Sequence, residues 1–164
     1  MARKKKGRSS ALLAFIATLF AVGAVVAMLG TAVSVETTNL GKKYSIDATA
    51  IELATQNETD YPATISAFAI ALGAILMFFM ATFAKLSGAK GGGIILFFGV
   101  LCAITSAVLM FLTKETFATA LAGGNSNLAN ELKKVIKLGV GSILPGILLA
   151  LSAFFSAVAG VIKK

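Results

Sequence analysis

Residues that carry most protein chemistry are scarce in this chain. Its 164 residues include no histidine and a single cysteine, and histidine is the commonest general base and metal ligand. Cys102 has no second cysteine for a disulfide or a thiolate metal site, and its apolar neighbours make it a small packing residue. The apolar stretches hold no paired carboxylates and no nucleophile–base pair, and HExxH is absent. We therefore predict no enzyme activity, no catalytic residue, no cofactor and no metal site.

Three short motifs resemble functional signatures, and each has a simpler interpretation. The three glycines at 91–93 lack the GxxxxGK[ST] spacing of a phosphate loop and predict a turn. Residues 57–59, Asn-Glu-Thr, match the N-glycosylation sequon, and whether Asn57 is glycosylated stays open. A group of acidic residues has no calcium-loop spacing and is interpreted as a solvated surface: Asp47, Glu52, Glu58 and Asp60.

The composition indicates that lipid surrounds most of the chain. Hydrophobic residues make up 57% of the sequence and charged residues 13%, whereas soluble domains carry about 25% charged residues. A helix needs ~20 apolar residues to cross the hydrocarbon core of a bilayer. Four stretches without a charge are long enough to do so: 9–35, 61–84, 91–113 and 138–162.

These stretches divide the chain into four spans and their connections. We place transmembrane helices at 11–35, 61–84, 94–113 and 138–162. The segments between them are an outer loop at 36–60, an inner loop at 85–93, and an outer loop at 114–137 with a short amphipathic helix. The tight inner loop makes the second and third spans an antiparallel hairpin. The ends, 1–10 and 163–164, are then cytoplasmic.

The first span is interpreted as an uncleaved anchor rather than a signal peptide. Its flanking segment 1–10 is basic, and Ala32 and Ser34 have the small side chains of a cleavage site. The apolar region of a signal peptide covers only ~7–15 residues. The charge-free stretch 9–35 is much longer, which favours the anchor.

The distribution of charge predicts the orientation in a cell membrane. With a cytoplasmic N-terminus, nine basic residues lie inside and six lie in the longer outer segments, in agreement with the positive-inside rule. All seven acidic residues then lie outside. The net charge of +8 is thus a membrane signal, and we predict no nucleic-acid partner. Five basic residues at the start set topology and favour anionic lipid headgroups: Arg3, Lys4, Lys5, Lys6 and Arg8.

The two outer loops contain patterns for short elements. Residues 45–54 fit a short helix capped by Ser45, but their β-branched content also fits a strand, and both alternatives stay open. In the second outer loop, a Gly-Gly-Asn-Ser-Asn break precedes an amphipathic turn at 128–138, capped by Ser126 or Asn127. We expect this turn to continue into the fourth span as one helix.

Small residues recur along the spans and predict how the helices pack. Lipid tails are as apolar as leucine, so small residues that let backbones approach drive helix association instead. Their 3-4-3 spacing is that of a left-handed coiled coil, although chance is an alternative in chains rich in Ala and Gly. We predict an all-α integral membrane protein, a left-handed four-transmembrane-helix bundle with crossing angles near ~20°. The predicted helix-packing seam comprises Ala14, Ala17, Ala21, Ala24, Ala67, Ala71, Ala74, Gly99, Ser106, Gly139, Ser142, Gly146, Ala153 and Gly160.

The spans contain little that transport requires. Pro145-Gly146 predicts a kink in the fourth span, either a hinge or a static bend. No span holds a charged residue, which argues against proton pumps, voltage sensors and most ion-coupled carriers. The hydroxyl groups in the spans can bond back to carbonyls of their own helix.

These absences lead to a functional prediction of assembly rather than chemistry. We predict a non-catalytic structural, scaffold or accessory subunit of a membrane assembly, whose partners are the lipid bilayer and either further copies of itself or other membrane subunits. The alternative is a small pore, a holin-like protein or a carrier for a neutral or apolar solute.

Overall fold

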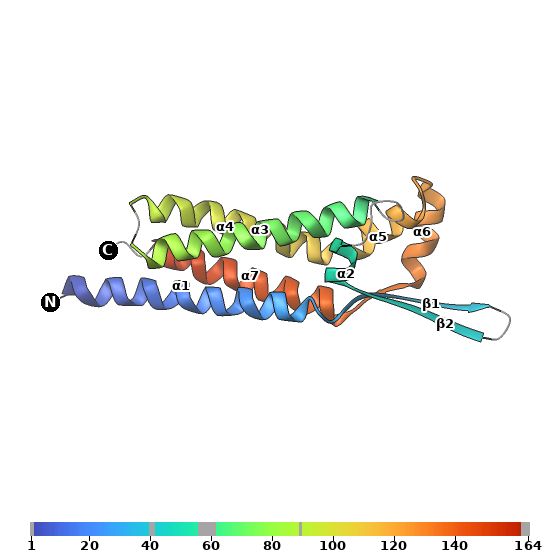
Figure 1. Ribbon diagram of the computed structural model, residues 1–164, viewed down its shortest axis with the longest axis horizontal. Coiled ribbons are helices and arrows are strands. Elements are labelled where there is room, and N and C mark those ends of the chain that lie inside the picture. Colours follow the sequence, from blue (N-terminus) through green and yellow to red (C-terminus); the bar gives the residue numbers. More distant parts are fainter. Residues whose placement is uncertain (1, 40–41, 56–61, 89, 162–164) are drawn as a thin grey trace.

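The computed structural model describes residues 2–39, 42–55, 62–88 and 90–161, and it is mostly helical (Figure 1). The helices are α1 Ala2–Ala27, α2 Ala50–Thr55, α3 Pro62–Leu86, α4 Gly92–Phe111, α5 Thr113–Leu121, α6 Ser126–Val135 and α7 Val140–Val161. The strands are β1 Thr31–Asn39, β2 Lys42–Thr49 and β3 Ile136–Leu138.

Four of the helices are long and apolar enough to cross a membrane. They are α1 over Ser9–Ala27, α3 over Ala69–Leu86, and the whole of α4 and α7. This confirms the prediction of four apolar helices and supports a multi-pass membrane protein. The outward faces carry many large apolar side chains, a surface suited to lipid rather than water. On α1 these side chains are between 46% and 60% exposed: Leu12, Phe15, Leu19, Val22 and Val26.

The long helices form a bundle in which neighbours follow the order α1, α7, α4, α3. A smaller contact between α3 and α1 closes the bundle. The start of α1, the α3–α4 connection and the end of α7 lie together at one end (Figure 1). We call it the basic end because its segments hold Arg3, Lys4, Lys5, Lys6, Arg8, Lys85 and Lys90. The opposite end, called the hairpin end, holds α2, α5, α6 and the three strands.

The prediction of an all-α protein is wrong at the hairpin end, where three strands form a sheet of order β2-β1-β3. β1 pairs antiparallel with β2 along its length and with β3 over Val33 to Val35. Residues 31–35, predicted as the end of the first span, therefore belong to a strand, and α1 ends at Ala27. β-Branched residues at every second position of 31–35 favour an extended chain once Gly30 has interrupted the helix.

The first outer loop contains both elements that its sequence allowed. β2 ends at Thr49 and α2 begins at Ala50, so the helix cap is Thr49 and not Ser45. The Thr49 hydroxyl accepts a hydrogen bond from the Glu52 N–H (3.1 Å), and the Glu52 carboxylate accepts one from the Thr49 N–H (2.8 Å). This reciprocal pair is a capping box. The backbone N–H of Thr49, and then its hydroxyl, lower the pKa of the Glu52 carboxyl below its ordinary value.

A strand separates the amphipathic helix from the last span, so the prediction of one continuous helix is wrong. α6 ends at Val135, and β3 pairs with β1 before α7 begins at Val140. Pairing with β1 supplies hydrogen-bond partners to backbone groups of 136–138, so these residues do not need the hydrogen bonds of a continuous helix. Immediately afterwards, the Gly139 N–H donates to the Ala32 carbonyl over 2.8 Å.

The cap of α6 also differs from the prediction of Ser126 or Asn127. The cap is Asn125, whose side-chain oxygen accepts hydrogen bonds from the N–H groups of Asn127 and Leu128. Asn125 has an extended backbone directly before the helix, and its side chain thereby satisfies two of the helix's unpaired donors. Leu128 is 47% exposed, so α6 keeps part of its apolar face open.

Candidate functional site

The structure buries most of the small residues that the sequence assigned to helix packing. Seven are 0% exposed and one is 5% exposed: Ala14, Ala17, Ala21, Ala24, Ala71, Ser106, Ser142 and, at 5%, Ala153. Gly99 and Gly146 are also buried, Ala74 and Gly139 are half-buried, and Gly160 is exposed. The side chain of Ala67 lies outside the described residues. Small residues therefore line the helix contacts, and near the basic end of α7 these are Ser156 and Ala159 rather than the predicted Gly160.

Buried serines hold different elements together by bonding to backbone carbonyls. Ser106 of α4 donates to Ala71 O of α3 (2.9 Å), and Ser10 of α1 donates to Ala159 O of α7 (2.8 Å). Two serines of α7 reach the first part of the chain: Ser142 donates to Ala32 O (3.0 Å), and Ser152 donates to Ala17 O. The prediction that hydroxyls of the spans bond within their own helix is wrong for Ser106, Ser142 and Ser152. It describes the threonines of the spans: Thr18, Thr82 and Thr105.

Replacing Ser106 by alanine is expected to lower the free energy of unfolding by about 0.6 to 1.7 kcal/mol, the range for interhelical hydrogen bonds in membranes. The reason is the loss of its bond to Ala71 O, which lies inside the bundle. Unfolding with increasing sodium dodecyl sulfate, followed by the helical circular dichroism signal, measures the difference in the free energy of unfolding. Thr105→Ala is the matched control, since the neighbouring Thr105 is exposed and bonds only to Leu101 O of its own helix. Equal losses for both variants would contradict the interhelical role.

Glycines permit a backbone-to-backbone crossing where α7 begins. A Cβ atom on Gly139 would lie 2.0 Å from Thr31 O, and one on Gly141 would lie 2.0 Å from Gly30 O. Both neighbours are backbone carbonyl oxygens, Gly30 O in the link between α1 and β1 and Thr31 O at the start of β1, which cannot move without moving the chain. The hydrogen bond from Ser142 to Ala32 O fastens the same crossing. We call residues 30–32 with 139–142 the glycine crossing.

Pro145 and Gly146 lie one turn further along α7, and Gly146 faces Phe111 of α4. Both are buried, and α7 stays helical from Val140 to Val161. The proline offers no N–H to the carbonyl four residues before it. A Cβ on Gly146 would lie 2.8 Å from the Phe111 ring, so this ring rests directly on the Gly146 backbone. A kink at this pair stays a prediction.

The hairpin of β1 and β2 has one apolar and one polar face by its register. Paired residues share a face, and the register joins Val33 to Ala48, Val35 to Ile46 and Thr37 to Tyr44. The alternate pairs are polar: Ser34–Asp47, Glu36–Ser45 and Thr38–Lys43. Near the bundle the apolar face belongs to the core, because Val33 is buried and Val35 and Ala48 pack against the same cluster.

The outer part of the hairpin extends away from the bundle. β3 pairs with β1 only over Val33 to Val35, so residues 36–39 and 42–45 form a two-stranded ribbon. Figure 1 shows this ribbon reaching past α6. Its base is fastened by an ion pair between Lys137 of β3 and Glu36 of β1 (2.8 Å). A second ion pair, between Lys133 and Glu115, joins α6 to α5.

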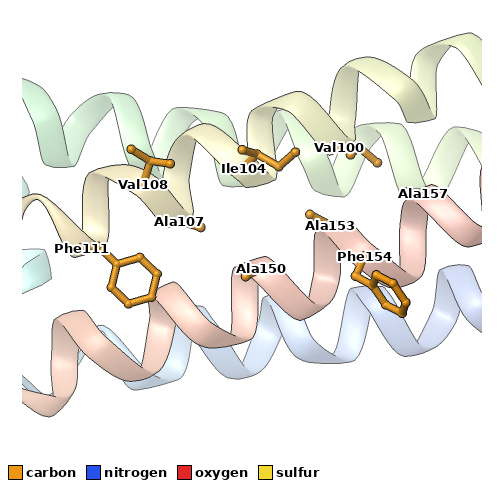
Figure 2. Close-up of a pocket in the computed structure, with 9 residues that line it drawn as sticks. All are labelled: Val100, Ile104, Ala107, Val108, Phe111, Ala150, Ala153, Phe154 and Ala157. Atoms are coloured by element: carbon orange, nitrogen blue, oxygen red, sulfur yellow. The ribbon is translucent and has the colours of Figure 1, made fainter.

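A groove follows the contact between α4 and α7, formed by two cavities that share Val100 and Ala157. The central cavity, of about 360 Å³, lies between 100–111 of α4 and 150–157 of α7 (Figure 2). Figure 2 shows the rings of Phe111 and Phe154 at its two ends, with Ala150 and Ala153 between them. Every side chain that lines this cavity is apolar.

The second cavity, called the basic-end cavity, continues the groove toward the end of the bundle. It measures about 380 Å³ and is lined by Gly93, Leu96, Phe97, Val100, Ser156, Ala157, Gly160 and Val161. Ser156 is its one polar side chain. This residue is 0% exposed, and its hydroxyl has no hydrogen-bond partner. A buried hydroxyl without a partner costs free energy, which makes Ser156 an exception among the bonded serines of the bundle.

The described residues contain no cluster of three or more His, Cys, Asp or Glu side chains that could hold a metal ion. Cys102 is a free, half-buried thiol. The side chains of the basic cluster at the start, Arg3 to Arg8, lie outside the description. Sequence reasoning missed the groove, since the same small residues also indicate tight packing, and it counted Ser156 only as one of the small hydroxyl residues of the fourth span. Comparisons with family models, curated proteins and solved structures find no match to this chain.

Proposed function

We propose that this chain is a non-catalytic accessory subunit of a membrane assembly, and that its β1–β2 hairpin docks on another subunit outside the bilayer. The observation that carries the proposal is the projecting ribbon of residues 36–39 and 42–45, which has no third strand. A two-stranded hairpin alone is marginally stable in water. A partner that covers it would supply the missing stabilisation.

The faces of the hairpin suggest how such a partner binds. The apolar face begins in the core with Val33 and continues outward through Ile46 and Tyr44 by register. An extended ribbon also offers the free backbone edge of β2 to an added strand, a common mode of recognition. Both routes use the outer part of the ribbon, beyond its pairing with β3. Tyr44 lies in this part, on β2, so the proposed contact includes it.

The proposed setting is the cell membrane, with both termini cytoplasmic and the hairpin outside. Its support is the excess of basic residues in the segments of the basic end over those of the hairpin end. The bilayer itself is the first partner, and a second copy or another membrane subunit is the second. No role in nucleic-acid binding is proposed, because topology accounts for the positive charge.

A pore receives less support than an assembly subunit. Within the described residues, the buried serines Ser10, Ser106, Ser142 and Ser152 donate to carbonyls of neighbouring elements. Their hydroxyls are thereby occupied and form no continuous polar stripe for water or ions.

Site-specific photocrosslinking tests the docking proposal. A photoreactive phenylalanine analogue replaces Tyr44 in the full chain in native membranes, and the adjacent Lys43, on the opposite face of the ribbon, is the matched control. We expect a discrete adduct from position 44 and several-fold less from position 43. Mass spectrometry of the adduct distinguishes a second copy from another subunit. Equal adduct from both positions, or none from position 44, would refute docking through this face.

A further inference from the structure

We propose that the α4–α7 groove binds an anionic phospholipid, with one acyl chain in the groove and the phosphate at the basic end. The site joins three observations that the docking proposal does not use. They are an apolar groove that opens on the side of the bundle, a buried hydroxyl without a partner, and an excess of positive charge at one mouth.

The shape of the groove selects a slender hydrocarbon. Apart from Ser156, its lining side chains are apolar or glycine, so the occupant is a hydrocarbon. Two turns of a helix ~10 Å wide would occupy on the order of 800 Å³. The two cavities measure about 360 and 380 Å³ and follow one another along the α4–α7 contact, so neither of them holds two turns of a helix from a second copy. A single acyl chain fits.

Charge complementarity fixes the headgroup. The basic-end cavity opens beside Gly93 and Val161, which lie next to the α3–α4 connection and at the end of α7. Lys90 is exposed in that connection, and Lys85 is half-buried in the last turn of α3. The acidic residues in the described segments belong to the strands, α2, α5 and α6, all at the hairpin end. An anionic phosphate at the basic end therefore meets positive charge without a competing carboxylate.

The depth of Ser156 matches the ester groups of such a lipid. Ser156 lies five residues before the end of α7 at Val161, which is ~7.5 Å along the helix axis. The headgroup and interfacial layer on each side of a bilayer is roughly 5–7 Å thick. A lipid whose phosphate is level with the helix end thus places an ester carbonyl near the Ser156 hydroxyl. Ser156 is 0% exposed, and its hydroxyl would turn toward the groove to donate to that carbonyl the hydrogen bond that it lacks.

Photolabelling of the unaltered chain tests the site directly. The protein is reconstituted in phosphatidylcholine vesicles that contain a minority of phosphatidylglycerol with a diazirine in one acyl chain. After illumination, peptide mass spectrometry locates the adducts. We expect several-fold more adduct on 100–111 and 150–161 than on the exposed face of α1. Adducts spread evenly over the outward faces of all four long helices would overturn the proposal.

Variants separate the groove from the charge. Ala157→Phe fills the point where the two cavities meet, and Ala69→Phe on the exposed face of α3 is its control. Lys90→Gln removes charge at the mouth, and Lys114→Gln at the hairpin end is its control. Native mass spectrometry after extraction counts the phosphatidylglycerol and phosphatidylcholine that stay bound.

The groove variant should lose bound lipid of both kinds, and Lys90→Gln should lower retention of phosphatidylglycerol about fivefold. The two controls should retain lipid as the unaltered chain does. Wild-type retention by Ala157→Phe, or equal retention of the two lipids by the unaltered chain, would overturn the site. If Ala157→Phe does not fold, photolabelling of the unaltered chain decides the question alone.

Discussion

Replacing Gly141 by alanine is expected to lower the free energy of unfolding by about 3 kcal/mol or more, at the upper end of overpacking effects. The added Cβ would lie 2.0 Å from Gly30 O and 2.5 Å from Gly30 C. Both atoms belong to the backbone of the glycine crossing, so relief requires α7 to move away from β1. The sheet pairing of β3 and the Ser142 hydrogen bond to Ala32 O would be lost with that movement.

Thermal unfolding in detergent micelles, followed by helical circular dichroism, measures this loss. Gly73→Ala is the matched control, because no atom lies within 4 Å of the Cβ position of Gly73 in α3. Alanine is also the better helix former, so this control should be as stable as the unaltered chain or slightly more stable. A Gly141→Ala protein that melts with Gly73→Ala would show that the crossing is looser than described.

Replacing Gly99 by alanine is expected to cost about 1–3 kcal/mol through overpacking between α4 and α3. The new Cβ would lie 2.5 Å from the Cβ of Ala81. Unlike the contact at Gly141, this clash involves one removable atom. Ala81→Gly in the Gly99→Ala chain should therefore recover most of the loss, since the next neighbours are Phe78 atoms at an ordinary 3.7 Å.

A double-mutant cycle gives the coupling between the two positions. We expect the double variant to be more stable than the sum of the single losses predicts, by 1 kcal/mol or more as an order of magnitude. Gly93→Ala, on the same helix with no atom within 4 Å of its Cβ position, controls for the change of residue type. If the losses from Gly99→Ala and Ala81→Gly were simply additive, these two residues would not be in contact between α3 and α4.

The length of the uncharged stretches sufficed to predict the four spans, but it did not predict where the first span ends. Residues 31–35 carry no charge, so they extend the apolar stretch, yet their β-branched pattern forms a strand. The strand there pairs with β2, the next strand, and with β3, which lies about a hundred residues away, and neither pairing is visible in the span itself. The start of α2 was readable, because Thr49 and Glu52 have the spacing of a capping box.

The seam of small residues was visible in the sequence, whereas its partners were not. The spacing of Ala14 to Ala24 marks a packing face, but it does not identify α7 as the neighbour. The serines show the same limit. From the sequence, Ser152 is expected to bond to a carbonyl of its own helix, but in the fold it donates to Ala17 O of α1 instead. Along α4 and α7 the small residues leave a groove, because Ala150 and Ala157 face space rather than a backbone.

The third strand makes the order of synthesis important for the hairpin. β1 and β2 leave the ribosome early, whereas the Lys137 that pairs with Glu36 comes 101 residues later. At about 5–20 residues per second, this separation amounts to roughly 5 to 20 seconds of translation. During that interval the hairpin has no β3 to fix its base. A subunit that docks through it would meet a hairpin with a fixed base only on chains made at least as far as β3, so partner binding would discriminate against copies that end before it.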